Sequence, residues 1–108
     1  MENYQSKIQK SLGQYEIELC EFMSQFPDKC FKLTKTPIQI MRTLIEEKYK
    51  DSETGLLGQL WTYLAQFFIQ LGQFGVARDI FEEALQPDLN GVKTVRDFAI
   101  VFNSYIKF

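Results

Sequence analysis

Histidine is absent from this chain of 108 residues, and cysteine occurs only twice, at Cys20 and Cys30. Without histidine, the sequence excludes the Ser-His-Asp and Cys-His arrangements of nucleophilic enzymes and every histidine-ligated metal site. Two cysteines are too few for a four-ligand zinc site, and their spacing fits neither a zinc nor a redox motif. We therefore expect a protein that is not an enzyme and that has no metal site and no cofactor.

An excess of positive charge and a long apolar run are also missing. The chain has 12 Lys and Arg against 14 Asp and Glu, a net charge of −2. Non-specific nucleic-acid binding depends on cations that neutralise phosphates, so we expect RNA contact to be weak at most. The most apolar stretch, residues 60–71, is interrupted by Gln and Thr and is shorter than the ~20 residues of a membrane span. We expect neither membrane insertion nor a small-molecule substrate.

Aromatic residues, by contrast, are abundant: ten Phe, five Tyr and one Trp. Apolar side chains recur at steps of three and four along nearly the whole chain, and no segment alternates with a period of two. This pattern predicts an all-α fold of about five helices. Their expected ranges are residues 5–26, 37–48, 56–71, 75–86 and 94–107.

The first two expected helices have recognisable ends. Pro27 ends the first helix, and Thr36, Pro37 and Gln39 form a capping box with proline at the first helical position of the second. The apolar stripe of the first helix is Ile8, Leu12, Tyr15, Leu19, Phe22 and Phe26, broadened by Ile17, Cys20 and Met23. The apolar side of the second is Ile38, Ile40, Met41, Leu44 and Ile45.

The later helices are expected to form an antiparallel hairpin followed by one more helix. Gly72 stands where a left-handed helix C-cap is expected, and the turn that follows is short. Thr94 can cap the last helix, with Asp97 at the position that reaches back to the cap. The apolar face of the last helix is Val95, Phe98, Ala99, Phe102, Tyr105 and Ile106.

The hairpin carries a specific sequence pattern. It reads Trp61-x-x-Leu64-Ala65-x-x-Phe68, then Gly72-Gln73-Phe74, then Ala77-Arg78-Asp79-Ile80-Phe81-Glu82-Glu83-Ala84-Leu85 and Pro87. This resembles the half-a-tetratricopeptide (HAT) repeat of RNA-processing proteins, although Glu83 stands where Arg is commoner. The strings Thr94-Val95-Arg96-Asp97-Phe98, Leu19-Cys20-Glu21 and Pro27-Asp28-Lys29 narrow the resemblance. Over residues 15–108 the chain is similar to the Syf-type, or XPA-binding protein two, family of HAT-repeat splicing factors.

The resemblance implies a fold and a function. The fold is a TPR-like α-solenoid of antiparallel helical hairpins, with residues 1–108 as one HAT-repeat segment of a longer array. The function is that of a non-catalytic scaffold in the Prp19-associated (NineTeen) complex of the spliceosome, in the nucleus, with other splicing-complex proteins and neighbouring repeats as partners. The animal protein is also linked to transcription-coupled repair. The expected repeat core is Trp61, Leu64, Ala65, Phe68, Gly72, Ala77, Ile80, Phe81, Ala84, Phe98 and Phe102.

Five residues outside that core are candidates for contact with a partner or with RNA. Lys29, Lys32 and Lys35 lie in a locally basic segment, which can equally be a solvated loop. Tyr63 and Phe67 lie outside the apolar face of the third helix. Two other functions stay open from the sequence: an adaptor of cleavage and polyadenylation or of ribosomal RNA maturation, and a small thiol-redox protein.

Overall fold

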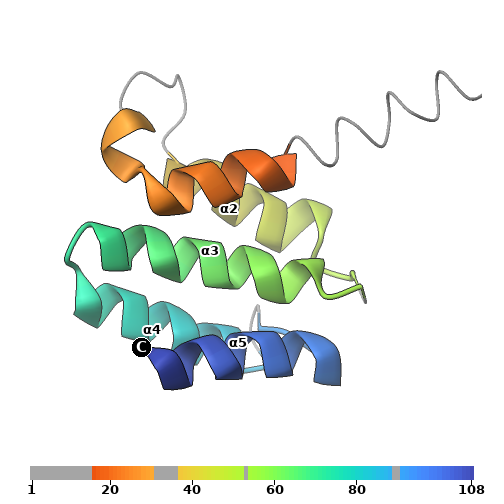
Figure 1. Ribbon diagram of the computed structural model, residues 1–108. Helices are drawn as coiled ribbons and strands as arrows, with labels where there is room; N and C mark the ends of the chain where they lie inside the picture. The colour runs from red at the N-terminus through yellow and green to blue at the C-terminus, as the bar shows by residue number, and fades with distance from the viewer. Residues whose placement is uncertain (1–15, 31–36, 53, 89–90) are drawn as a thin grey trace, which may run out of the picture.

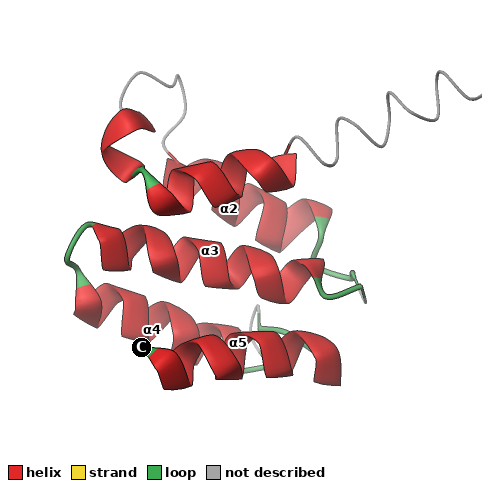
Figure 2. Ribbon diagram, viewed as in Figure 1, coloured by secondary structure: helices red, strands yellow, loops and turns green. Residues whose placement is uncertain are grey.

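The computed structural model describes residues 16–30, 37–52, 54–88 and 91–108. In these residues there are helices, turns and loops and no β-strand (Figure 2), which confirms the predicted all-α fold. The main helices are residues 16–25, α2 (Pro37–Thr43), α3 (Leu56–Gln70), α4 (Phe74–Ala84) and α5 (Val95–Lys107). Two short helical segments are η1 (Pro27–Cys30) and η2 (Leu44–Lys48).

Helix α3 occupies the middle of the molecule (Figure 1). The helix of residues 16–25 and α2 lie on one side of it, and α4 and α5 lie on the other. The packing of α3 against α4 and α5 is more extensive than its packing against α2 and η2. The result is a stack of antiparallel helices, as expected for a HAT repeat.

The first helix buries only part of the apolar side predicted for it: Ile17 and Leu19 pack against the core, but the two phenylalanines of the stripe do not enter it. Cys20 and Met23 are fully buried, whereas Phe22 and Phe26 are 44 % and 41 % exposed. These two rings instead pack on each other, with centroids 5.2 Å apart. The predicted stripe also includes Ile8, Leu12 and Tyr15, which lie outside the described residues. The core therefore receives Cys20 and Met23, which the prediction placed at the broadened edge of the stripe.

The second expected helix, residues 37–48, is helical throughout but changes its winding. Its first seven residues form α2, and η2 continues as a wider π-helical turn that ends with a hydrogen bond from Tyr49 N to Leu44 O of 2.8 Å. Of the predicted capping box, Pro37 is the first residue of α2 as expected, and the capping residue Thr36 lies outside the described residues. Met41, Leu44 and Ile45 are buried, and Ile38 is exposed.

Helix α3 is buried on two sides because it has neighbours on two sides. Eight of its fifteen residues are buried. Phe67, which the sequence placed outside the core face and offered for partner contact, is only 5 % exposed and packs edge-on against Phe68 at 5.4 Å. Phe67 is therefore a core residue, and Tyr63 is half-buried against the same core.

The turn between α3 and α4 closes as predicted at Gly72. This glycine has φ of +77°, in the left-handed region. Gln73 N donates to Phe68 O at 2.9 Å, and Gly72 N donates to Ile69 O at 3.0 Å. These two bonds form a Schellman motif, which satisfies carbonyls that the end of α3 would leave unpaired.

The hairpin core contains most of the residues predicted for it. The structure buries Trp61, Leu64, Ala65, Phe68, Ala77, Ile80, Phe81 and Ala84. Phe98 and Phe102 are different: both are 43 % exposed. They were expected in the core, but they lie on the side of α5 that no described element covers. The packed side of α5 instead contributes Val101, which is fully buried.

Candidate functional site

Helix α5 is fixed at its N-terminus by a buried carboxylate that caps two helices. Asp97 is fully buried, and its backbone N–H donates to Thr94 Oγ1 at 3.1 Å. The Thr94 hydroxyl donates to Asp97 Oδ2 at 2.7 Å, and Gly58 N in the first turn of α3 donates to Asp97 Oδ1 at 3.0 Å. The predicted cap therefore also ties α5 to α3.

The same junction explains the glycine in the first turn of α3. A Cβ atom on Gly58 would lie 2.8 Å from the carbonyl oxygen of Asp97 and 3.0 Å from its Cα. Real Cβ atoms do not approach a backbone oxygen so closely, so α5 can lie this near α3 only where position 58 has no side chain. The sequence analysis did not single out Gly58; a glycine inside a helical pattern was the available signal.

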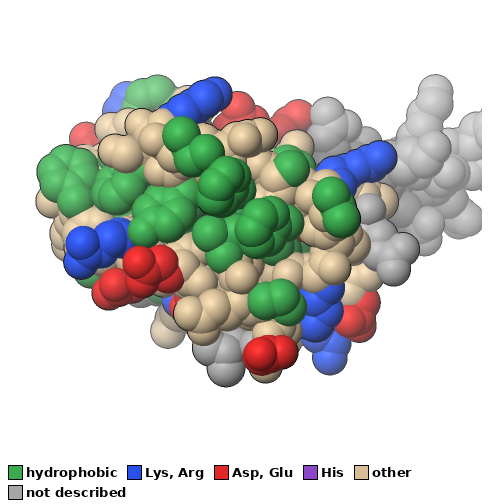
Figure 3. Space-filling view, turned by 90° about the horizontal axis from the view of Figure 1, so that it is seen from below, with side chains coloured by type: hydrophobic (Ala, Val, Ile, Leu, Met, Phe, Trp, Pro, Cys, Tyr) green, Lys and Arg blue, Asp and Glu red, His purple; other side chains and the backbone are tan. Residues whose placement is uncertain are grey.

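Beyond this junction, α5 presents an apolar stripe to solvent, which we call the outer face of α5. Its residues recur at steps of three and four: Val95, Phe98, Phe102 and Ile106. Val95 is 87 % exposed and Ile106 is 67 % exposed, and the rings of Phe98 and Phe102 stack with centroids 5.8 Å apart. The view from below shows hydrophobic side chains gathered on this side of the molecule (Figure 3).

The opposite side of α5 is occupied by the hairpin. Tyr105 stacks on Phe81 of α4 with centroids 5.1 Å apart, and its hydroxyl donates to Glu82 Oε1 at 3.2 Å. Phe108 also packs against Phe81, at 5.6 Å. Because these contacts use one side of the helix, the outer face of α5 has no partner among the described residues.

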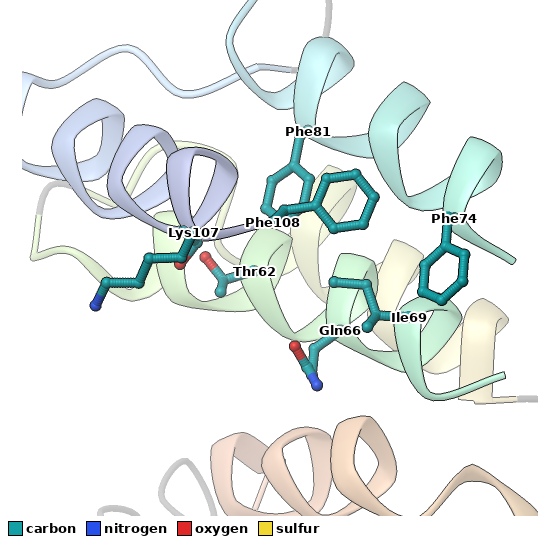
Figure 4. A pocket seen from close by; sticks show the side chains of 8 residues that line it. Thr62, Gln66, Ile69, Phe74, Phe81, Lys107 and Phe108 are labelled. Atoms are coloured by element: carbon teal, nitrogen blue, oxygen red, sulfur yellow. The ribbon is translucent and has the colours of Figure 1, made fainter. Parts of the chain in front are cut away.

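Two hollows adjoin α5. A small one of about 230 Å³ lies at the N-terminal end of the outer face and is lined by Pro87, Val92, Lys93, Thr94, Val95 and Phe98. A larger groove of about 530 Å³ lies on the inner side, among α3, α4 and the end of α5 (Figure 4). Its lining is Thr62, Gln66, Ile69, Phe74, Phe81, Ser104, Lys107 and Phe108. Apolar side chains with a few polar and lysine side chains line both hollows, a composition that suits the docking of side chains from a partner.

The predicted basic contacts are only partly described. Lys29 is exposed, and its ammonium lies 5.6 Å from the centroid of the Phe26 ring. Lys32 and Lys35 lie outside the described residues. Of the three predicted lysines, only Lys29 lies in the part of the chain that the structure describes, so no basic cluster of these residues is seen there.

The burial and the raised pKa of Cys20 indicate that its thiol packs in the core and is not a reactive group. Cys20 is fully buried, and burial, with a smaller contribution from Glu16, raises the pKa of its thiol to about 12. A thiol that stays protonated at neutral pH is a poor nucleophile and a poor metal ligand. Nothing is described of the Cys30 side chain. Among the described residues, no three or more acidic or cysteine side chains are grouped so that they could hold a metal ion, and none of the helices there is a candidate membrane span.

An ion pair that the sequence analysis did not predict joins α2 to α4. Arg42 of α2 forms a two-bond ion pair with Glu83 of α4 and lies over the ring of Trp61. Glu83 is the residue that departs from the usual repeat pattern, and the pairing gives that departure a structural reason. Glu82 and Glu83 turn to different partners, so they do not form a carboxylate pair.

Comparison with known proteins gives a consistent result. The family model described as the pre-mRNA-splicing factor SYF1 middle HAT repeat matches residues 1–108. The pre-mRNA-splicing factor SYF1 of Homo sapiens is 42 % identical over 107 residues, which cover 99 % of this chain and 11 % of that protein.

Two more distant organisms give similar matches. The Dictyostelium discoideum SYF1 is 39 % identical over 100 residues, 92 % of this chain and 10 % of that protein. The Schizosaccharomyces pombe pre-mRNA-splicing factor cwf3 is 33 % identical over 103 residues, 95 % of this chain and 12 % of that protein. The chain thus spans about a tenth of the length of these curated relatives. No solved structure matches it significantly.

Proposed function

The chain belongs to the family of the SYF1 middle HAT repeat, and on that premise we propose that it is a non-catalytic scaffold segment acting in pre-mRNA splicing. The relatives are named as pre-mRNA-splicing factors from animals, a slime mould and a fission yeast. A HAT repeat supplies surfaces for stacking and docking, and the residues described above offer packing groups instead of a nucleophile and base.

The observation that carries the proposal is the outer face of α5. Four apolar side chains at helical spacing, two of them stacked rings, form a surface that suits another amphipathic helix. In a repeat array each helical pair covers such a face of its neighbour. We infer that the outer face of α5 packs against the next helical pair of a longer array, and that the array as a whole presents its remaining surfaces to partner proteins.

We infer further that the chain acts in the Prp19-associated complex in the nucleus. The resemblance to the Syf-type splicing factors implies this assignment, and the relatives' names support the broader role in pre-mRNA splicing. Direct RNA contact contributes little in this proposal, because the chain has a net charge of −2. Lys29, Lys32 and Lys35 are the candidates for what contact there is.

Affinity purification tests this assignment. The protein is tagged in its full natural length and recovered from nuclear extract, and the co-purifying proteins are identified by mass spectrometry. We expect components of the Prp19-associated complex. The matched control lacks residues 1–108, and we expect it to lose part of that set. Recovery of no splicing-complex protein with the intact form would refute the proposed function.

A further inference from the structure

A single side chain, Arg42, connects three helices. Its Nη1 donates to Glu83 Oε2 at 2.8 Å and its Nη2 donates to Glu83 Oε1 at 2.9 Å, a parallel two-bond pair between α2 and α4. The guanidinium carbon lies 5.2 Å from the centroid of the Trp61 ring in α3. Glu46, one turn further along the chain, approaches Nη1 at 3.6 Å.

We propose that Arg42, Glu83 and Trp61 form a clasp that couples the N-terminal helix pair to the α3–α4 hairpin and sets the angle between them. Arg42 and Glu83 are 41 residues apart in sequence, so the contact joins separate structural units. It is a conformational device, and it does not depend on which partners the chain binds.

The N-terminal pair is the part of the molecule that needs such a contact. Helix α3 packs more extensively against α4 and α5 than against α2 and η2. Because their packing against α3 is less extensive, α2 and η2 should separate from α3 at a lower free-energy cost than α4 or α5. A cross-helix contact at this joint therefore has a larger effect on local opening than it would have between α3 and α4.

The surroundings strengthen the ion pair without burying it completely. The side chains of Arg42 and Glu83 are 29 % and 28 % exposed, and the indole of Trp61 covers one face of the guanidinium. Partial shielding from water strengthens both the charge-assisted hydrogen bonds and the cation–π contact. In agreement, the hydrogen bond to Glu83 raises the pKa of Arg42.

Trp61 depends on Arg42 for its polar contact. The side chain is fully buried, and its indole N–H donates no hydrogen bond to any residue that the structure describes. Packing and the guanidinium together hold the ring. Because Trp61 is the one tryptophan of the chain, selectively excited tryptophan fluorescence reports on the surroundings of this ring.

The test compares variants of the whole chain by hydrogen exchange and by Trp61 fluorescence. Arg42→Ala removes the clasp, Arg42→Lys keeps a charge but not the planar fork, and Arg42→Glu combined with Glu83→Arg exchanges the charges. The matched control is Lys48→Ala, which breaks the Lys48–Glu16 pair (2.7 Å) between η2 and the first helix. Each protein is measured at about 0.05 M and at about 1 M salt, where the Debye length falls to about 3 Å.

We expect the amides of α2 and η2 to exchange about tenfold faster in Arg42→Ala, with α3, α4 and α5 unchanged. The Trp61 signal should change with them, and Arg42→Lys should give an intermediate result. The charge exchange should restore part of the protection, because it re-forms the ion pair but loses the guanidinium over Trp61 and places a second carboxylate beside Glu46. High salt should reduce the difference between wild type and Arg42→Ala. Lys48→Ala should leave the Trp61 signal as in wild type.

Three results would overturn the clasp. The first is unchanged exchange of α2 and η2 in Arg42→Ala. The second is equal loosening of α3, α4 and α5, because that would be general destabilisation. The third is an effect of Lys48→Ala on Trp61 equal to that of Arg42→Ala. If Arg42→Ala does not fold, Arg42→Lys and the charge exchange decide by the same readouts, which are independent of any splicing partner.

Discussion

The side chain of Asp97 connects two helices in addition to forming the capping box predicted for α5. Its two carboxylate oxygens accept from different helices, one from Gly58 N of α3 and one from the Thr94 hydroxyl at the start of α5. A carboxylate is tolerated at this fully buried position because both oxygens are hydrogen-bonded. The side chain consequently determines both where α5 begins and how it lies on α3.

Replacing Asp97 by Ala should therefore be strongly destabilising. It leaves the Gly58 N–H and the Thr94 hydroxyl without their acceptors, at an expected loss of about 2–3 kcal/mol in the free energy of unfolding. Urea unfolding followed by circular dichroism measures it. Asp79→Ala, on the exposed side of α4, is the control and should change stability by no more than about 0.5 kcal/mol. Equal midpoints for the two variants would contradict the role of Asp97.

The buried thiol of Cys20 gives a second prediction at this scale. In a Cys30→Ser background, iodoacetamide at about pH 8 should leave Cys20 unmodified in the folded chain, because its pKa is raised to about 12, and should modify it once urea unfolds the chain. Mass spectrometry measures both. Rapid alkylation of the folded chain would show that the thiol is accessible and ionised.

The same shift predicts how stability depends on pH. Because the pKa of Cys20 is about 12 in the folded state against 9.0 for an unperturbed thiol, both states hold the proton below about pH 9. As the pH rises from 9 toward 12 the unfolded state loses the proton first, so stability falls. Cys20→Ala should lack this part of the decline, measured as the difference between the two urea-unfolding profiles.

At the scale of single elements, the end of α3 allows a matched pair of glycine substitutions. Gly72 has φ of +77° and open space where a Cβ would be, so Gly72→Ala adds backbone strain without a clash. It should lower stability by about 1 kcal/mol. Gly75 lies in the first turn of α4, also with open space at its Cβ position, and Gly75→Ala should be neutral or stabilising by up to about 1 kcal/mol.

Thermal unfolding of the two alanine variants separates these effects. Opposite shifts relative to wild type are expected. Shifts of the same sign would mean that the left-handed turn is not retained in solution, because both positions have equally open surroundings.

Local chemistry made the helix ends predictable, whereas the buried faces needed the tertiary arrangement. The turn at Gly72 and the cap between Thr94 and Asp97 form within a few residues, so their sequence context was sufficient to predict them. The periodicity placed Phe67 outside the apolar face of its helix and Phe98 on the apolar face of its helix, yet Phe67 is buried and Phe98 is exposed. Periodicity shows that a face is apolar, but not which neighbour covers it.

The contacts between helices that are distant in the sequence were harder to predict than the buried faces. The Arg42–Glu83 pair and the Gly58–Asp97 junction join residues 41 and 39 positions apart. Nothing in the spacing of charges along one helix indicates which charge on another helix will meet it. Glu83 was visible as a departure from the repeat pattern, but its partner became identifiable only when α2 and α4 were seen beside α3.

For the molecule as a whole, the sixteen aromatic residues are many for a chain of this length, and those that the structure describes occur both in the core and on the surface. Trp61, Phe67 and Phe81 fill the space around α3. Phe98 and Phe102 form part of an outer surface, and so do Phe22 and Phe26 at the opposite end of the stack. Apolar groups at both ends of a stack are expected where further helical pairs continue it.

The outer face of α5 should therefore make the isolated chain self-associate. Changing Phe98 and Phe102 together to Ser removes the stacked pair at the centre of this face, yet both rings are 43 % exposed, so the cost to folding should be small. We expect less concentration-dependent association in sedimentation velocity and weaker binding of an apolar dye, with a melting temperature within about 5 °C of wild type.

Changing Phe22 and Phe26 to Ser is the matched control, since these rings are similarly exposed and also in contact. It lacks the longer stripe that Val95 and Ile106 add on α5, so its effect on association should be smaller. Equal effects of the two double variants would mean that exposed rings in general, and not the outer face of α5, cause the association.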